Sequence, residues 1–364
     1  MPDRQERPQN PIFKGKRVLI TGGTGSLGTV LLRRLLSGQA GYPDRIVVFS
    51  RDESKQHQLR LDLRQIRSAT DEIVYQTAKS NLEFRIGDVR DFHAVAAALS
   101  GIDIVFNTAA LKQVPTCEYF PYEAVQTNIE GPENIVRAIR TLNLPVQTVV
   151  GISTDKAVSP INVMGLTKAL QERIFVNANR DLTNTRFILA RYGNVLASRG
   201  SVIPLFHEQI RLGGPVTITD ENMTRFLLSL EDAVTVILTA VREARSGETY
   251  VPVIPSARVV DVANALINGR KIGTTITGRR PGEKIHEVLI SEEERFRTIK
   301  RERHYVIEPI LPELRHDNDV RSVLEREYSS GDNVMNLDDV RELLIRENLM
   351  VPGEPALRRR ELLR

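Results

Sequence analysis

Short apolar runs alternate with longer amphipathic segments through the first half of the chain. The apolar runs predict strands at Arg17–Ile20, Arg45–Phe49, Leu82–Ile86, Ile104–Asn107 and Val146–Ile152. Between them, apolar residues at helical spacing predict helices at Leu27–Leu36, Asp52–Ile66, Asn128–Leu142 and Gly165–Ala178. Such alternation is typical of a parallel sheet with helices on both faces. The pattern therefore predicts an α/β fold with a doubly wound parallel sheet.

The alternation weakens in the second half of the chain, which is richer in turns and indicates a smaller second domain. A late helix is predicted to begin after Asn336, because asparagine is a good N-cap and apolar residues follow at helical spacing. The predicted parts are an N-terminal tail over 1–15, a sheet domain over 16–185, a smaller domain over 186–349 with segments that return to the sheet domain, and a basic C-terminal tail over 350–364.

The composition excludes several classes of protein. The 364 residues are 41% hydrophobic and 26% charged, which is ordinary for a globular chain. The single cysteine, Cys117, excludes a disulfide framework and is interpreted as a small buried residue, and the six histidines show no metal-ligand spacing. The longest uncharged stretch, 18–32, is too short to cross a bilayer, and the N-terminus has no signal-peptide core. We therefore expect a cytoplasmic protein without a metal or a membrane segment.

Basic residues barely outnumber acidic ones, with 50 Lys and Arg against 46 Asp and Glu and a formal net charge of +4. The two signs are interleaved along the chain instead of forming blocks. This distribution argues against nucleic acid as a partner, and a small anionic ligand explains the slight excess equally well.

The first predicted strand runs directly into a glycine-rich turn and then into a leucine-rich helix. Glycines permit a tight turn and let the backbone approach a pyrophosphate, whose charge is met by N–H groups at the helix start. A strand before and a helix after the glycines are the context that a dinucleotide site requires. The segment therefore predicts a Rossmann-like dinucleotide site formed by Thr21, Gly22, Gly23, Thr24, Gly25, Ser26, Leu27 and Gly28.

The end of the second predicted strand indicates which dinucleotide binds. Ser50 and Arg51 stand there, before the first acidic residue, Asp52. A guanidinium with a hydroxyl suits the 2′-phosphate of NADP, because Arg holds phosphate oxygens through paired hydrogen bonds. The alternative is that Arg51 is solvated and Asp52 binds the ribose of NAD. Asp88, after the third strand, is expected either to reach the adenine or to cap a helix over 92–100.

The segment that follows the fifth predicted strand completes a resemblance to a known family. It reads STDKAVSPINVMGLTK over 153–168, and with it stand TGGTGSLG, SRDESKQ, GDVRD, NTAALKQVPTCEYFP, ARYGNVLASRGSVIPLF, MTRF and RPGEK. These motifs span residues 17–287. The chain resembles the extended short-chain dehydrogenase/reductases and, among them, the bacterial capsule-type nucleotide-sugar 4,6-dehydratases that act on UDP-N-acetylglucosamine. The resemblance implies a homo-oligomer, with a hexamer as one form.

Met164 departs from the common pattern of that superfamily, in which a tyrosine base precedes the lysine, here Lys168, by four residues. A thioether cannot accept a proton, so another group must do so. The inverting capsule-type dehydratases are known for such a methionine. The resemblance therefore implies that Lys156 is the base at sugar C5, Asp155 the acid that releases water, and Thr154 an orienting residue. It assigns Lys168 to the nicotinamide ribose.

Other interpretations of this segment stay open. Asp155 is alternatively a turn cap, and Lys168 alternatively an exposed helix lysine. Loss of the tyrosine is also what a non-catalytic NADP-binding regulator would show. A UDP-sugar 4-epimerase would share the cofactor and the first oxidation but would return the hydride to C4.

The resemblance implies a reaction that oxidises C4, eliminates water across C5 and C6, and reduces C6, so that NADP is restored. The product would be a UDP-4-keto-6-deoxy-amino sugar, inverted at C5, for surface polysaccharide synthesis. Further cofactor contacts are expected at Val89, Ala109 and Ala110. The phosphates and uracil of the substrate call for cations and amides, and the matching motifs place them at Lys112, Arg191, Asn194, Arg199, Arg225, Arg280 and Glu283. Each arginine taken alone would more often be a surface residue, and it is the matching motifs that favour a substrate contact.

Overall fold

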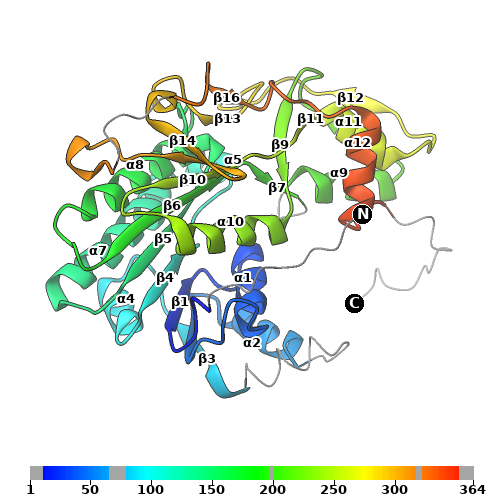
Figure 1. Ribbon diagram of the computed structural model, residues 1–364. Helices are drawn as coiled ribbons and strands as arrows, with labels where there is room; N and C mark the ends of the chain where they lie inside the picture. The colour runs from blue at the N-terminus through cyan, green and yellow to red at the C-terminus, as the bar shows by residue number, and fades with distance from the viewer. Residues whose placement is uncertain (1–10, 65–78, 197–200, 317–321, 352–364) are drawn as a thin grey trace. The chain divides into compact units, whose positions relative to one another are not determined.

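The computed structural model describes residues 11–64, 79–196, 201–316 and 322–351 (Figure 1). Within these ranges the chain forms two compact units, each built from segments that are distant in sequence. The first unit contains the described residues of Met1–Gly193, Leu230–Val253 and Val288–Ser329. The second contains the described residues of Asn194–Ser229, Ile254–Glu287 and Ser330–Arg364.

A nine-stranded sheet forms the centre of the first unit. Seven neighbouring strands, in the order β10-β6-β5-β4-β1-β2-β3, run parallel. Beyond β10, β15 pairs antiparallel with β10, and β14 pairs antiparallel with β15. The strands cover Arg17–Thr21 (β1), Arg45–Ser50 (β2), Leu82–Ile86 (β3), Ile104–Asn107 (β4), Thr148–Thr154 (β5), Arg186–Tyr192 (β6), Thr249–Pro252 (β10), Thr298–Arg301 (β14) and His304–Ile307 (β15). This arrangement confirms the predicted α/β fold with a large parallel sheet.

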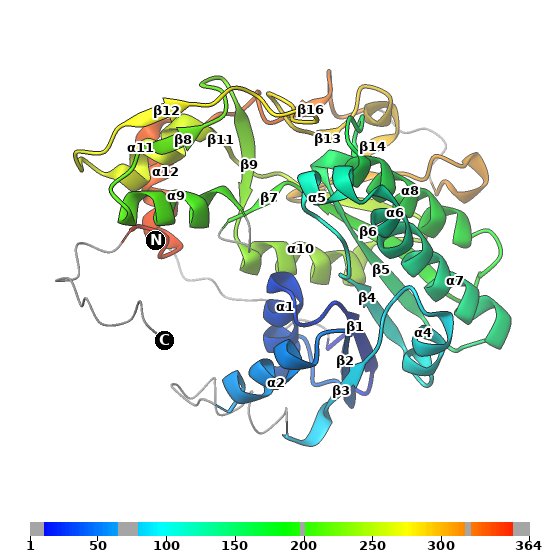
Figure 2. The same cartoon turned by 180° about the vertical axis from the view of Figure 1, so that it is seen from behind.

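Helices cover both faces of this sheet (Figure 2). Helices α4, α7 and α8 share one apolar core with the strands, in which Ile135, Phe175 and Phe187 are fully buried. Helices α1 and α10 pack against each other on the other face. The bounds are Ser26–Leu36 (α1), Glu53–Asp62 (α2), Phe92–Leu99 (α4), Gly131–Leu142 (α7), Val163–Ala178 (α8) and Leu230–Glu243 (α10).

Polar residues start these helices by accepting hydrogen bonds from N–H groups of the first turn. Asp52 accepts from the N–H of Lys55 at 2.9 Å, and Asn162 accepts from the N–H of Gly165 at 2.8 Å. Asn336 does the same for α12, Leu337–Arg346, which confirms the late helix start.

Two predicted element ends differ from the structure by three residues or more, and the other differences, such as those of β5 and the start of α8, are of one or two residues. The helix expected from Asn128 begins as α7 only at Gly131, because Asn128 lies in a π-helical turn, η1 (Gln126–Glu130). The helix expected over 52–66 is α2, which ends at Asp62, and residues 65 and 66 lie outside the described part of the chain.

The second unit has its own small sheets and core. Phe206, Leu266 and Leu344 are fully buried in it. Its elements are Asn194–Val195 (β7), Val202–Arg211 (α9), Val216–Ile218 (β8), Thr224–Leu228 (β9), Ser256–Arg258 (β11), Val259–Ile267 (α11), Thr274–Ile276 (β12) and α12. Strands β11, β9 and β7 form one sheet, and β12 pairs with β8.

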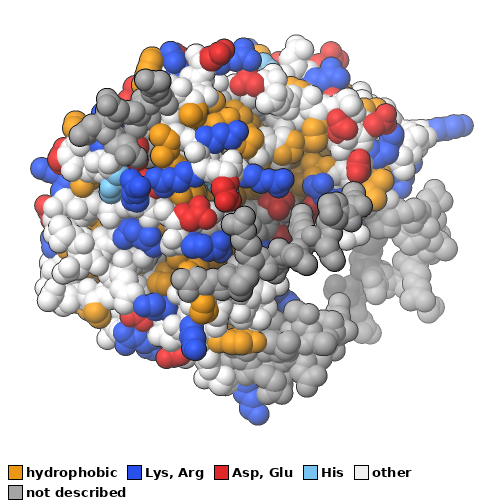
Figure 3. Space-filling view, in the orientation of Figure 1, with side chains coloured by type: hydrophobic (Ala, Val, Ile, Leu, Met, Phe, Trp, Pro, Cys, Tyr) orange, Lys and Arg blue, Asp and Glu red, His pale blue; other side chains and the backbone are white. Residues whose placement is uncertain are grey.

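The surface carries both signs of charge. On the face drawn in Figure 3, Lys and Arg side chains are interspersed with Asp and Glu. Among the described residues, no helix has both the length and the apolar character needed to cross a membrane.

Candidate active site

The turn after β1 is shaped so that side chains are excluded from it. Gly22 has a φ of +64°, and a Cβ there would lie 2.8 Å from the backbone of Ala109. A Cβ on Gly28 would lie 2.6 Å from the Cα of Gly23, so α1 packs directly on the turn. Gly25, the N-cap of α1, supplies no side-chain cap to the first helical turn. This cradle of bare backbone at a helix start fits a pyrophosphate.

A cavity of about 240 Å³ lies beside this turn, at the carboxyl ends of the parallel strands. Its lining includes eight of the residues predicted to bind the cofactor, namely Gly22, Thr24, Ser50, Arg51, Asp88, Val89, Ala109 and Ala110. Thr21 stands just below it and donates a hydrogen bond from its hydroxyl to the side chain of Asn107 at 2.9 Å. The glycine turn and the segments that follow β2, β3 and β4 therefore form a pocket of the kind expected for a dinucleotide.

Sequence reasoning missed other residues that line this cavity. They are Phe49, Lys55, Gly87, Leu111 and Thr127, and Asp52, the alternative ribose ligand, also lines the cavity. Lys55 could have been predicted from the sequence. It follows Arg51 by four residues at the start of a predicted helix, so the two side chains are expected on the same side of the chain. Thr127 could not have been predicted in this way, because it lies in the π-helical turn η1, which no local pattern indicates.

Asp88 lies among arginines. Its carboxylate accepts hydrogen bonds from the backbone and the guanidinium of Arg90, and Arg51 lies 3.8 Å away. Burial raises the pKa of Asp88, but the hydrogen bonds and charge of Arg90 outweigh it, so the net pKa is below the ordinary value. The alternative that Asp88 caps α4 is wrong, because Asp91 accepts from the first N–H groups of that helix.

Asp52, the acidic residue next to Arg51, is occupied by Lys55. One oxygen of its carboxylate accepts the Lys55 N–H at 2.9 Å, and the other lies 2.8 Å from the Lys55 ammonium. These contacts lower the pKa of Asp52. An Asp52 that bound a ribose hydroxyl would have to share its oxygens with this cap.

Thr154, Asp155 and Lys156 come together at the end of β5. Asp155 is fully buried, and one of its oxygens accepts from the Thr154 hydroxyl at 2.9 Å and from the Lys156 ammonium at 3.0 Å. Lys156 keeps 22% of its side chain exposed. Thr154, not Asp155, caps the short helix η2 (Asp155–Ala157), so the described contacts do not make Asp155 a turn cap. The trio can hold and transfer a proton beside an accessible amine.

Lys168 is buried on α8, so the alternative of an exposed helix lysine is wrong. Its ammonium donates to the carbonyl of Ile152 at 2.5 Å and to the side chain of Gln171 at 2.6 Å. Burial lowers the pKa of Lys168 to about 8, and the nearby Glu172 carboxylate opposes that shift.

Met164 fills the usual tyrosine position with a buried thioether. It packs in a small cluster with Cys117 and Ala124. Burial also raises the pKa of the Cys117 thiol to about 11, which agrees with its interpretation as a small core residue. The titratable group of this cluster is the Cys117 thiol, which its raised pKa keeps protonated near neutral pH, so acid–base chemistry must come from elsewhere.

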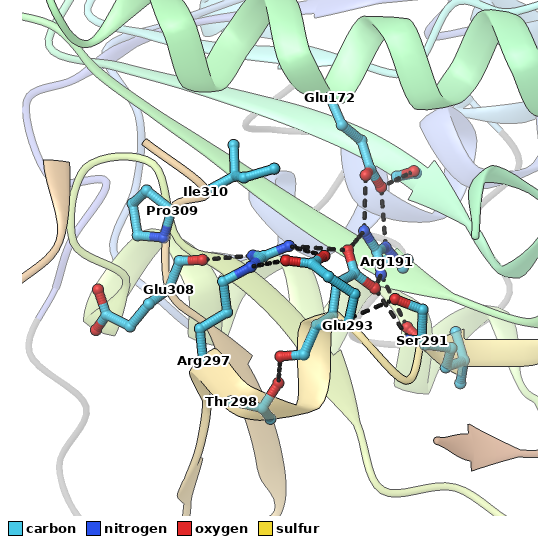
Figure 4. A network of polar contacts seen from close by, with 12 residues as sticks. Glu172, Arg191, Ser291, Glu293, Arg297, Thr298, Glu308, Pro309 and Ile310 are labelled. Atoms are coloured by element: carbon cyan, nitrogen blue, oxygen red, sulfur yellow. Dashed lines mark hydrogen bonds and ion pairs between the residues drawn. The ribbon is translucent and has the colours of Figure 1, made fainter. Parts of the chain in front are cut away.

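Arg191 was expected to contact substrate, and the structure corrects this. It is buried, and its five N–H donors are used by Glu172, Glu294 and the carbonyl of Leu289, at 2.7 to 2.9 Å (Figure 4). Glu172 also accepts from the Ser153 hydroxyl at 2.5 Å. Arg191 therefore joins β6 to α8 and to the short helix η3 (Glu294–Arg297), and has no donor left for a phosphate.

The remaining substrate candidates belong to both units. Lys112 is exposed after β4 in the first unit. In the second unit, Arg225 donates to the carbonyls of Thr224 and Ile285, and Glu283 accepts from the N–H of Arg280. The buried Oδ1 of Asn194 accepts no hydrogen bond from the described residues, which leaves an acceptor that a ligand can satisfy. Arg199 lies outside the described residues.

Comparison with known proteins gives a match over most of the chain. Residues 18–309 match the family described as polysaccharide biosynthesis protein. The chain belongs to this family. A relative from Rickettsia canadensis named UDP-glucose 4-epimerase is 40% identical over 348 residues, covering 93% of this chain and 97% of the relative. A Rickettsia typhi relative of the same name is 41% identical, covering 92% and 96%.

Solved structures of other proteins share the fold of this chain. Pen from Bacillus thuringiensis superposes with a TM-score of 0.82 at 33% identity, covering 93% of this chain and 99% of that one. DesIV, a dTDP-glucose 4,6-dehydratase from Streptomyces venezuelae with NAD bound, gives a TM-score of 0.61 at 22% identity over 74% and 86% of the chains. The second likeness is one of fold alone.

Proposed function

We propose that this chain is a nicotinamide-dependent enzyme that modifies a UDP-sugar, and more narrowly an NADP-dependent UDP-N-acetylglucosamine 4,6-dehydratase that inverts C5. One observation carries the proposal. The Asp155–Lys156 pair stands at the end of β5 with a 3.0 Å separation, while the usual tyrosine position holds the buried Met164. The groups able to transfer a proton therefore stand at the end of the strand and not at the usual position on the helix. This placement suits removal of a carbon-bound proton next to a ketone.

The pair can carry the elimination without an outside acid or base. In its neutral form, Lys156 takes the C5 proton, and the proton of the buried Asp155 passes through the Thr154 hydroxyl, 2.9 Å away, to the departing C6 oxygen. The C6–O bond breaks, a C5–C6 double bond forms, and water leaves. The pair is then Lys⁺ and Asp⁻, and transfer of one proton across 3.0 Å restores it. When bound, NADP would take the C4 hydride and return it to C6, and the proton released from O4 would balance the proton that C5 regains.

NADP is favoured over NAD by the charges at the far end of the cavity. Arg51 and Lys55 both line it and keep 61% and 55% of their side chains exposed. Asp52 is bound to Lys55 and Asp88 to Arg90, so neither carboxylate stands alone for a ribose diol. Two accessible cations suit a 2′-phosphate, and Lys168 would approach the nicotinamide ribose from the α8 side.

A UDP-sugar 4-epimerase is the second candidate, and the names of the Rickettsia relatives favour it. Both reactions oxidise C4 and so need a base at O4, but an epimerase needs none at C5, which is the role proposed here for Lys156. The buried Met164 cannot be the O4 base of either reaction, so the preference for the dehydratase rests on the Asp155–Lys156 pair and not on the methionine.

Product analysis in heavy water separates the two reactions. Purified protein is incubated with UDP-N-acetylglucosamine and NADP, and the nucleotide sugar is examined by NMR and mass spectrometry. A product lighter by one water and deuterated at C5 is expected. An unchanged mass with an altered C4 signal assigns the epimerase instead, and an unreacted sugar that still binds would overturn both assignments for this substrate.

A further inference from the structure

Gly165 lies in the first turn of α8, where the backbone conformation does not require glycine. Its φ lies outside the left-handed region, and glycine inside a helix costs about 1 kcal/mol relative to alanine. A Cβ at this position would lie 2.2 Å from the carbonyl oxygen of Lys156 and 3.1 Å from its carbonyl carbon. The reason for glycine here is therefore close packing against the backbone of Lys156.

This contact holds η2, which carries Lys156, against α8. Helix α8 packs on η2, and Asn162 holds the first turn by accepting from the Gly165 N–H at 2.8 Å. The Lys156 carbonyl faces Gly165, while the Lys156 ammonium reaches Asp155 at 3.0 Å. A shift of that carbonyl would move the Cα of Lys156 and so the origin of its side chain.

We propose that Gly165 is a positioning residue for Lys156. Because Gly165 has no side chain, α8 can hold the η2 backbone at contact distance. The Lys156 amine is thereby kept in contact with Asp155 and directed toward C5 of the sugar. The inference rests on the proposed function, since Lys156 is the base only there.

Gly165→Ala tests the inference with a single methyl group. The atom it meets is backbone, so no side-chain rotation relieves the overlap and η2 must move by about 1 Å to reach ordinary contact. We expect kcat for dehydration to fall about 100-fold, because such a displacement of a reacting group costs that much. The Kd for NADPH, measured by fluorescence titration, should change less than threefold, since Gly165 does not line the cavity.

Gly151→Ala is the matched control. Gly151 is also crowded, but a Cβ there would meet the side chains of Phe175 and Leu189 at 2.5 to 2.7 Å, in the sheet core. Both variants should melt at a lower temperature, yet only Gly165→Ala should lose kcat per folded molecule. Equal kcat losses in the two variants, or an unchanged kcat in Gly165→Ala, would overturn the inference.

A second readout does not depend on the reaction. Lys156 is partly exposed, so its rate of reductive methylation can be followed by mass spectrometry in wild type and variants. Loosening of its Asp155 contact should raise that rate at least threefold in Gly165→Ala and leave it unchanged in Gly151→Ala. If wild type proves inactive on the sugar, the proposed function fails while this rate still decides whether Gly165 positions Lys156.

Discussion

At the scale of single residues, the exchange of a phenol for a thioether decides how the site is interpreted. Met164 is buried among apolar neighbours, and the groups able to hold a proton are Asp155 and Lys156 at the end of β5. Asp155 is fully buried and Lys156 partly exposed, so only the amine of the pair is open to a substrate. This asymmetry makes the amine the better partner for a carbon acid and the carboxyl the better internal relay.

Lys156→Ala should remove dehydration and leave cofactor binding intact. We expect kcat to fall at least about 1,000-fold, within the range for loss of a general base, while the Kd for NADPH stays within about twofold. Lys300→Ala, which removes an exposed lysine on β14, is the matched control and should behave as wild type. Steady-state kinetics and fluorescence titration measure both effects. Normal turnover in Lys156→Ala would rule out the base assignment.

Arg51→Gln should change the preference between the two dinucleotides. Loss of one charge-assisted contact to a 2′-phosphate is worth about 1.5 to 3 kcal/mol, which weakens NADP binding about 10- to 100-fold. Binding of NAD, which lacks that phosphate, should change little. Arg60→Gln, on the helix α2 that follows Arg51, is the control, because the Arg60 guanidinium lies over Phe84 and does not line the cavity. An equal loss for both cofactors in Arg51→Gln would contradict a 2′-phosphate contact.

At the scale of elements, an ion network joins parts of the chain that are far apart in sequence. Arg191 on β6 pairs with Glu172 on α8 and with Glu294 on η3, at 2.7 and 2.8 Å. Glu172 also holds Ser153, the residue before Thr154. The network therefore supports the strand end from which the candidate catalytic segment leaves.

Arg191→Leu should destabilise the protein strongly. It would leave two buried carboxylates without their shared cation, which costs about 3 to 5 kcal/mol of unfolding free energy. Arg180→Leu is the control, because its pair with Glu313 is about half exposed on both sides, and such pairs contribute about 1 kcal/mol or less. Urea unfolding followed by circular dichroism measures both. A loss below about 1 kcal/mol in Arg191→Leu would show that the network is not a structural support.

The same network shows what sequence could and could not predict. Strand ends, caps and the glycine turn depend on neighbouring residues, so β1 to β4, α1 and the Asn336 cap follow from local pattern. Arg191 sits in a motif that resembles substrate-binding positions, yet its partner Glu294 comes from a segment 103 residues later. No local pattern carries that pairing, so a buried structural arginine was interpreted as a ligand contact.

At the scale of the whole molecule, the parallel sheet gathers residues from distant turns at one edge. The carboxyl ends of β1, β2, β3 and β4 contribute to a single cavity, and that of β5 carries the Asp155–Lys156 pair. Ligands of open parallel sheets bind at the carboxyl ends of the strands, so the position of the cofactor site could be predicted once the alternation was recognised. The antiparallel strands β14 and β15 could not, because nothing local assigns them to the same sheet.

The stability of the first unit should fall steeply in acid through Glu294. Burial raises the pKa of this carboxyl, but the charge and hydrogen bonds of Arg191 outweigh it and hold the pKa at about 2, against an ordinary 4.5. A group with a lowered folded-state pKa contributes stability that is present above pH 4.5 and is lost as pH falls toward 2. For a difference of this size the contribution is about 3 kcal/mol.

Glu294→Gln tests that pH dependence, because an amide of the same shape does not titrate. The variant should be less stable than wild type at pH 7, and the gap in unfolding free energy should narrow as pH falls from 4.5 to 2.5. Glu293→Gln is the matched control, since its carboxylate is 65% exposed and pairs with Arg297 at 3.2 Å. Denaturant unfolding at several pH values measures the gap. A difference in unfolding free energy that stays constant with pH would mean that Glu294 keeps an ordinary pKa. The charge of Arg191 would then not stabilise the Glu294 carboxylate.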